Sequence, residues 1–193
     1  MWTKQRTLSA SLVVVIALLL SACSHTINQE YNPRMERVAS HYTPQISLQV
    51  QSEYGNREGV MLAPNFYLGP SYDRWFQRGL ATEFQRAGFE VYPQPMKGIP
   101  HISVWTTEFS IESFITLYLV YYIRGGAAAA TVFDVELYDP GSGRVFQRRF
   151  ATTRDERSHY GHSPDELEEI LREMLVEVYA EIVTETYNLL AQN

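Results

Sequence analysis

Residues 127–153 read AAAATVFDVELYDPGSGRVFQRRFATT and carry the strongest strand signal in the chain. Apolar and polar side chains alternate before and after the central DPGSG, as in two half-buried strands. Asp139, Pro140 and the two glycines that follow favour a tight turn. We therefore predict an antiparallel ribbon with strands at 127–138 and 145–153. The alternation leaves open which face the first half of 127–138 buries.

The segment after the ribbon predicts a long helix. Ser163 and Glu166 have the spacing of a capping box, with Pro164 at the first helical position. Apolar residues then recur at helical spacing and should pack along the sheet; they are Leu167, Ile170, Leu171, Met174, Leu175, Val178, Tyr179, Ile182 and Val183. The opposite face is rich in Glu and is interpreted as facing solvent.

The segment before the ribbon predicts shorter elements. Apolar alternation indicates strands at 45–50, 60–63, 89–92 and 101–111, and a change of phase in the last one indicates a bulge. A helix should begin with Ser71 as its N-cap, bury an aromatic stripe, and end at Gly88 in the left-handed conformation. We expect an α+β domain at 44–193, in which two helices pack on one face of an antiparallel sheet.

Composition excludes several classes of protein. The chain has 193 residues, a formal charge of −6 and one cysteine. The negative charge argues against a nucleic-acid-binding surface. A single cysteine can form neither an internal disulfide nor a zinc site built from several thiolates.

The first 22 residues have the features of a secretory signal. Lys4 and Arg6 precede an apolar run that ends at Leu20, which is too short to span a bilayer. The following Ser-Ala-Cys resembles the lipobox of bacterial lipoproteins, which implies that signal peptidase cleavage leaves Cys23 as a lipidated N-terminus carrying acyl chains such as palmitate. By resemblance to enterobacterial lipoproteins, Ser24 implies the periplasmic face of the outer membrane.

The polar residues that follow Cys23 predict a linker. Residues 24–43 mix both charge signs and show no sustained apolar period. We therefore expect a lipidated N-terminus and flexible tether at 23–43. Contact with the membrane should be made through the anchor at Cys23, because the mature domain is acidic and suits anionic lipid poorly.

Residues 114–123, FITLYLVYYI, are apolar on both alternation phases and carry no charge. Three interpretations are open: a strand buried on both faces, a membrane helix, or an exposed edge or hairpin tip that a partner or lipid covers. The third makes the segment a docking surface. Its candidate partner-binding residues are Leu117, Leu119, Tyr121, Tyr122 and Ile123.

The sequence offers weak candidates for chemistry. His159 and His162, with acidic residues nearby, could bind a divalent metal, but histidines in a polar loop are more often only solvated. No Ser or Thr has the context of an activated nucleophile, and the acids of the last helix should face solvent. We therefore expect a protein that is not an enzyme and has no metal or cofactor.

The order of segments also carries a family resemblance. A helix that closes in Ala87-Gly88-Phe89-Glu90-Val91, followed by strands and a tail helix, resembles small outer-membrane lipoproteins of the YajG and LptE type over residues 58–190. The LptE type implies an assembly partner of an outer-membrane β-barrel. The leading hypothesis is a lipoprotein that supports assembly or stability of an envelope protein complex. The alternative is a lipid- or glycan-binding carrier, or an auxiliary lipoprotein of an envelope transport system.

Overall fold

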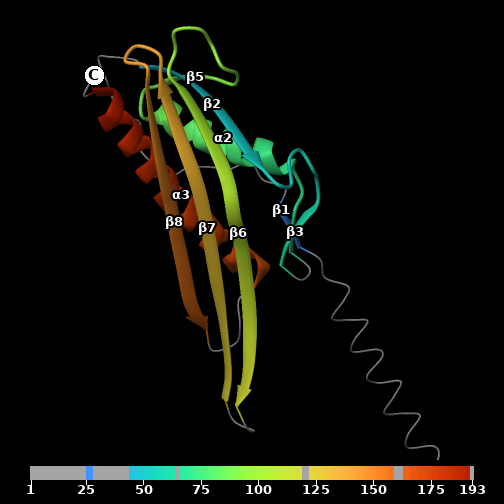
Figure 1. Ribbon diagram of the computed structural model, residues 1–193. Helices are drawn as coiled ribbons and strands as arrows, with labels where there is room; N and C mark the ends of the chain where they lie inside the picture. Colours follow the sequence, from blue (N-terminus) through green and yellow to red (C-terminus); the bar gives the residue numbers. More distant parts are fainter. Residues whose placement is uncertain (1–24, 28–43, 64–65, 119–121, 159–162, 192–193) are drawn as a thin grey trace, which may run out of the picture.

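A computed structural model describes residues 25–27, 44–63, 66–118, 122–158 and 163–191 (Figure 1). Its elements, in chain order, are β1 (His25–Ile27), β2 (Gln45–Ser52), β3 (Val60–Ala63), β4 (Phe66–Leu68), α2 (Tyr72–Arg86), β5 (Glu90–Tyr92), β6 (His101–Tyr118), β7 (Tyr122–Asp139), β8 (Arg144–Ser158) and α3 (Pro164–Ala191). Among the described residues, neither helix is long and apolar enough to cross a bilayer.

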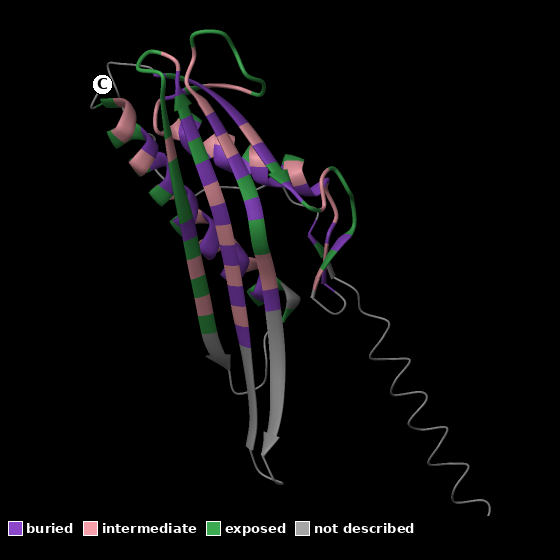
Figure 2. Ribbon diagram, in the orientation of Figure 1, coloured by how far each residue is buried: buried purple, intermediate pink, exposed green. Residues whose placement is uncertain are grey.

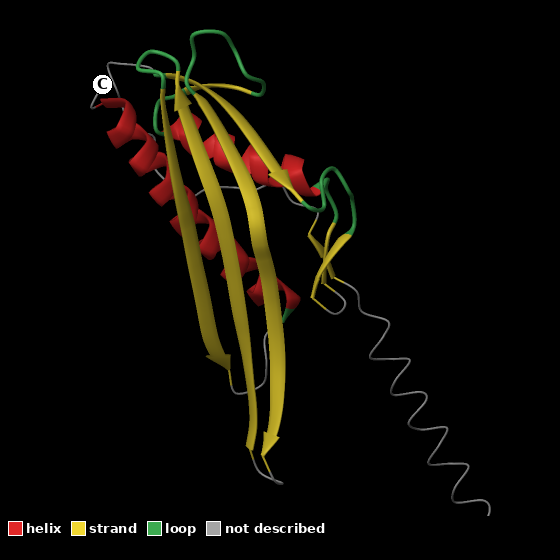
Figure 3. Ribbon diagram, in the orientation of Figure 1, coloured by secondary structure: helices red, strands yellow, loops and turns green. Residues whose placement is uncertain are grey.

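A five-stranded sheet in the order β5-β2-β6-β7-β8 forms the body, and both helices lie on one of its faces (Figures 1 and 3). The predicted α+β class is therefore confirmed. The sheet is mixed, however, and the prediction of an antiparallel sheet is wrong for β2, which runs parallel to β5 and β6. The reason is connectivity, since α2 carries the chain from β2 across to β5 and such a crossover joins parallel strands.

A second sheet of three strands, in the order β1-β4-β3, lies beside the body (Figure 1). Its strand β1 pairs with β4 in parallel, and Ile27 is buried there. This corrects the prediction of a flexible tether for residues 25–27, because a run of three residues is too short to show a strand period. His25, the first residue that the structure describes, is thus part of the small sheet.

An aromatic cluster centred on Phe76 joins the two helices to the sheet. The Phe76 ring lies 4.8 Å from the ring of Tyr72, 4.8 Å from Phe109 on β6 and 5.8 Å from Phe133 on β7, measured between centroids. Phe133 in turn lies 5.8 Å from Tyr179 of α3. These tilted and edge-on contacts add to the burial of the rings, so the cluster is the energetic centre of the core.

The predicted bulge in β6 is present. The pairing of β6 with β7 shifts register between Thr106 and Glu108, so that Thr107 is the additional residue. The bulge reverses which side chains face the helices, and it brings Phe109 and Ile111 to the core. On β7 the structure also decides the open question of the buried face, since Ala127, Ala129 and Thr131 are buried (Figure 2).

The helix ends follow the sequence signals in part. At α3 the Ser163 amide donates to Glu166 Oε2 (2.6 Å) and the Glu166 amide donates to Ser163 Oγ (3.3 Å), which confirms the capping box. At α2, Ser71 is the N-cap by position, but its hydroxyl donates to Asn56 Oδ1 instead of accepting from the helix. Carbonyl groups of the 55–57 turn accept from the first amides of α2, so no side-chain cap is needed there.

We expect Phe76→Ala to lower the free energy of unfolding by about 3 to 5 kcal/mol, because it removes a ring that is 1% exposed and leaves a cavity between helices and sheet. Urea denaturation followed by circular dichroism measures the change. Met61→Ala is the control, since Met61 is 61% exposed and should change stability by less than about 0.5 kcal/mol. An equal loss in both variants would contradict the central role of Phe76.

Candidate functional site

The far end of the β6–β7 hairpin extends beyond the rest of the sheet (Figure 1). On one side β2 stops pairing with β6 at Thr106, and on the other β8 stops pairing with β7 at Gly125. The pairs Thr116–Arg124, Leu117–Ile123 and Tyr118–Tyr122 therefore belong to a ladder of two strands only, within the part of the chain that the structure describes. We call residues 116–118 and 122–124 the hairpin end.

The hairpin end contains three of the five predicted partner-binding residues. Leu117 is paired with Ile123, and Tyr122 is paired with Tyr118 in the next row. Leu119 and Tyr121 lie outside the described residues. The described residues on both sides of them are strands, so the interpretation of 114–123 as a membrane helix is wrong. The role of the segment in docking stays a prediction.

The hairpin end is unlike the edge of the sheet at β8. Arginines follow one another along β8, and two of them reach α3: Arg148 pairs with Glu185, and Arg154 Nη2 lies 2.9 Å from Glu173 Oε2. Charged side chains on an edge strand oppose pairing with another chain. Residues 114–123 carry no charged side chain, and Arg124 is the one charged residue of the hairpin end.

A second candidate site lies on the sheet face opposite the helices, where a hollow of about 690 Å³ surrounds Trp105. The register places Gln51, Trp105, Asp134 and Arg149 in one row across β2, β6, β7 and β8. Trp105 is 45% exposed although it lies in the middle strand of the sheet. The backbone pairing of the strands thus places the indole ring of Trp105 between the polar side chains of Gln51 and Asp134.

Hydrogen bonds fix the polar side chains of this hollow. Arg149 Nε and Nη2 donate to the two carboxylate oxygens of Asp134 at 2.7 and 2.9 Å. In the next row on the same face, Gln147 Nε2 donates to Glu136 Oε2 at 2.7 Å. The Arg149 hydrogen bonds hold the pKa of the Asp134 carboxyl below its usual value. Each carboxylate of the hollow therefore already has a hydrogen-bond donor from the protein.

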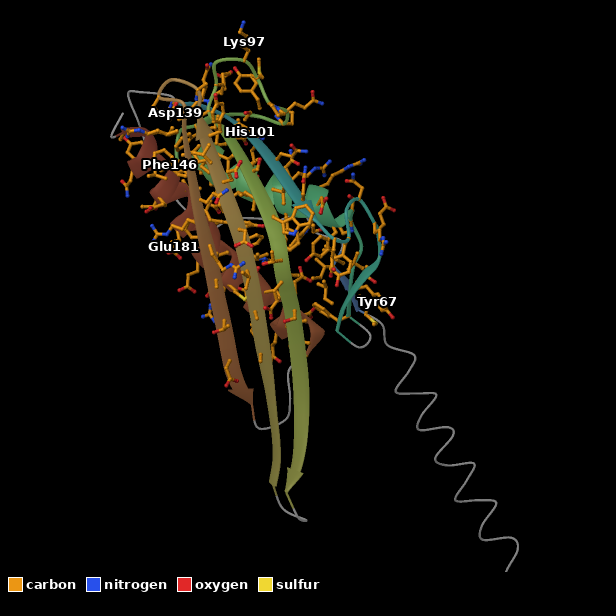
Figure 4. The ribbon with its side chains drawn as sticks, viewed as in Figure 1. Tyr67, Lys97, His101, Asp139, Phe146 and Glu181 are labelled. Atoms are coloured by element: carbon orange, nitrogen blue, oxygen red, sulfur yellow. The ribbon has the colours of Figure 1, made fainter. Side chains whose placement is uncertain are left out.

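A histidine lies on the same face, near the end of the sheet away from the hairpin end (Figure 4). His101 Nδ1 is 3.0 Å from Ser47 Oγ, and His101 Nε2 is 3.1 Å from Ser103 Oγ. Ser47 Oγ donates to the Pro100 carbonyl, so in a neutral imidazole Nδ1–H donates to Ser47 and Nε2 accepts from Ser103. Two hydroxyl groups contact the ring, and no carboxylate among the described residues does so. The partner that orients a catalytic histidine is commonly a carboxylate.

A hollow of about 770 Å³ lies at that same end of the sheet, between the β7–β8 turn, the loop before β6 and the end of α3. Its acidic residue, Asp139, accepts hydrogen bonds from the Ser142 hydroxyl (2.6 Å) and from the Gly141 amide (3.0 Å). The Ser142 hydroxyl is the main cause of a lowered pKa of Asp139. These hydrogen bonds stabilise the β7–β8 turn, so the Asp139 carboxylate has a structural role.

The remaining candidates from the sequence are the lipidation site and the two histidines considered as metal ligands. Cys23, His159 and His162 lie outside the described ranges. Within those ranges, no three His, Cys, Asp or Glu side chains come together as a possible metal site. Sequence reasoning missed Trp105, although a signal was present: in HISVW the tryptophan falls on the polar phase, with His101 and Ser103.

The fold is similar to that of several proteins of known structure. An uncharacterised protein matches with a TM-score of 0.55 and 17% identity over 82% of this chain and 98% of its own. A DUF330 protein from Xanthomonas campestris matches with a TM-score of 0.55 and 14% identity over 86% and 96% of the two chains. A weaker likeness, with a TM-score of 0.44 and 14% identity over 76% and 97%, is to rare lipoprotein B from Shewanella oneidensis.

The two matches with a TM-score of 0.55 show the fold. No protein-family model and no curated protein matches the sequence. The resemblance to lipoproteins of the YajG and LptE type stays a prediction.

We expect Arg149→Gln to raise the pKa of Asp134 toward its ordinary value, because the variant loses the two hydrogen bonds to the carboxylate. A lowered folded-state pKa stabilises the fold above the unfolded-state pKa, and this contribution disappears as the pH falls through the folded-state value. Both side chains are substantially exposed, and solvent screening should keep the effect on stability small.

Carboxyl carbon NMR over a pH titration measures the shift of Asp134. Arg148→Gln is the matched control, because Arg148 pairs with Glu185 on the helix side of the same strand. It should leave the titration of Asp134 unchanged. An unaltered Asp134 titration in Arg149→Gln would contradict the assignment.

Proposed function

We propose that this protein is a lipid-anchored, non-enzymatic protein on the periplasmic face of the bacterial outer membrane. It binds an envelope protein through the end of the β6–β7 hairpin and supports the assembly or stability of that protein. The anchor is the diacylglycerol and palmitate-type acylation of Cys23 implied by the lipobox resemblance.

One observation carries the docking role. The β6–β7 ladder continues past the last β8 pair at Gly125, and beyond Arg124 it consists of residues from the uncharged segment 114–123. A two-stranded hairpin is only marginally stable in water by itself, and contiguous apolar sequence without a neighbouring strand is a recurrent mark of protein contact. The helices cover one face of the sheet, and charged side chains protect its β8 edge. A partner would therefore add its surface at the hairpin end.

The start of the folded body supports the anchored arrangement. β1 begins at His25, two residues after Cys23, and Ile27 is buried against the small sheet. Lipid on Cys23 would therefore hold the body close to the bilayer. The folded body supplies the docking surface, and the acyl chains supply the membrane affinity.

We expect a photo-reactive amino acid at Leu117 or Ile123 to crosslink one discrete envelope protein in intact cells. The same amino acid at Glu181, which lies on α3 and away from the hairpin end (Figure 4), should not. Immunoblotting of the lipoprotein after irradiation and mass spectrometry of the product identify the partner. Crosslinks at Glu181 with none at the hairpin would refute the docking site.

Substitutions separate docking from folding. Leu119→Asp and Tyr121→Asp should abolish recovery of the partner and leave the melting temperature within a few degrees, because a charge in the contact is costly only when the partner is bound. Val145→Asp is the control: Val145 is 53% exposed on β8 and should affect neither quantity. Unfolding of both hairpin variants would show that 114–123 is core, and docking there would be wrong.

The anchor has its own test. We expect the mature protein to begin at Cys23 and to carry the mass of a diacylglyceryl group and a further acyl chain. Intact-mass analysis of the purified protein measures this, and Cys23→Ala should move the protein from the membrane fraction to the soluble fraction. A mature chain that begins elsewhere, or that carries no lipid, would contradict the anchor without affecting the hairpin prediction.

A further inference from the structure

The hollow around Trp105 has the composition of a ligand site. Trp105 provides an aromatic face, and the neighbouring strands provide the planar polar groups of Gln51, Asp134, Glu136 and Gln147. Small-molecule sites commonly combine an apolar wall with a few fixed polar groups, and a volume of about 690 Å³ falls within their usual range.

The charges of the hollow favour a neutral ligand. Two carboxylates, Asp134 and Glu136, and two guanidinium groups, Arg148 and Arg149, line the hollow, so the formal charge of the lining is zero. Asp134 and Arg149 form a bidentate pair, and Glu136 accepts a hydrogen bond from Gln147. An anion would meet two carboxylates, and it would have to displace Asp134 to reach Arg149. A cation would meet the guanidinium groups of Arg148 and Arg149 and would find Asp134 already paired. A lipid chain would cover these polar groups without replacing their contacts with water, which is costly.

From these observations we infer that the Trp105 hollow binds a neutral oligosaccharide. The C–H groups on one face of a sugar ring are slightly positive and are attracted to the negative face of an indole ring. The hydroxyl groups of the sugar both donate and accept hydrogen bonds. They match the carboxylate oxygens of Glu136 and the amide groups of Gln51 and Gln147, which also offer acceptors and donors.

The strand ladder makes the site rigid before a ligand arrives. Gln51, Trp105 and Asp134 belong to three neighbouring strands whose register is fixed by backbone hydrogen bonds. The bidentate Arg149 contact and the Gln147 contact hold the carboxylates in place. A ligand therefore pays little to order the site. The inference is independent of the lipid anchor and of docking by the hairpin.

Calorimetry and tryptophan fluorescence of the full-length mature protein test the site. The protein is purified in a detergent without a sugar headgroup, and the probes are three neutral hexasaccharides: hexa-N-acetylchitohexaose, cellohexaose and maltohexaose. We expect saturable binding of at least one of them with a shift in fluorescence, since Trp75 is buried and Trp105 is exposed. Trp105→Ala should weaken that binding at least tenfold, and Gln147→Ala several-fold.

Tyr138→Ala is the matched control, because Tyr138 is 43% exposed on the same face but does not line the hollow. It should bind the probe like the unaltered protein. The inference is overturned if none of the three sugars binds, if Trp105→Ala binds as tightly as the unaltered protein, or if a sulfated hexasaccharide binds better than every neutral one. Crosslinking of a protein at Trp105 in place of sugar binding would overturn it too.

Discussion

The packing of Phe76 against Phe109 and Phe133 is the contact on which the other elements depend. It joins α2 to the two longest strands, and through Tyr179 it joins α3 to the same cluster. The additional residue Thr107 makes this possible, because it reverses the alternation of β6. Phe109 then faces the helices while Trp105, four residues earlier, faces solvent. One bulge thus serves both the core and the open face of the sheet.

Much of this arrangement could be predicted from local patterns. The DPGSG turn, the capping box of Ser163 and Glu166, and the change of phase in β6 each act over a few residues, and the sequence shows them directly. The parallel direction of β2 could not be predicted, since alternation of side chains is the same in both strand directions. Strand β1 was missed because three residues carry no period. The exposed position of Trp105 follows from its alternation with Ile102 and Val104, but a large aromatic residue in a strand is usually expected in the core.

The β8 edge and the β6–β7 hairpin differ in the charged side chains that accompany their unpaired backbone groups. Along β8, arginines contact Asp134 on the open face and Glu173 and Glu185 of α3 on the other. Part of the acidic surface of α3, which the sequence analysis interpreted as facing solvent, therefore fastens the helix to the edge strand. The same arginines discourage another chain from pairing with β8. Residues 114–123 of the hairpin carry no charged side chain of this kind.

Strand β1 also sets the distance over which an anchored molecule could search for its target. A linker of 21 residues, from 23 to 43, could extend about 70 Å, whereas the two steps from Cys23 to His25 extend about 7 Å. With lipid at Cys23, as proposed, the body would diffuse in a thin layer along the membrane surface. Encounters would then occur in two dimensions and at a high effective concentration, so a weak and rapidly reversible contact would be sufficient. A contact of that kind would also let one molecule serve several targets in turn.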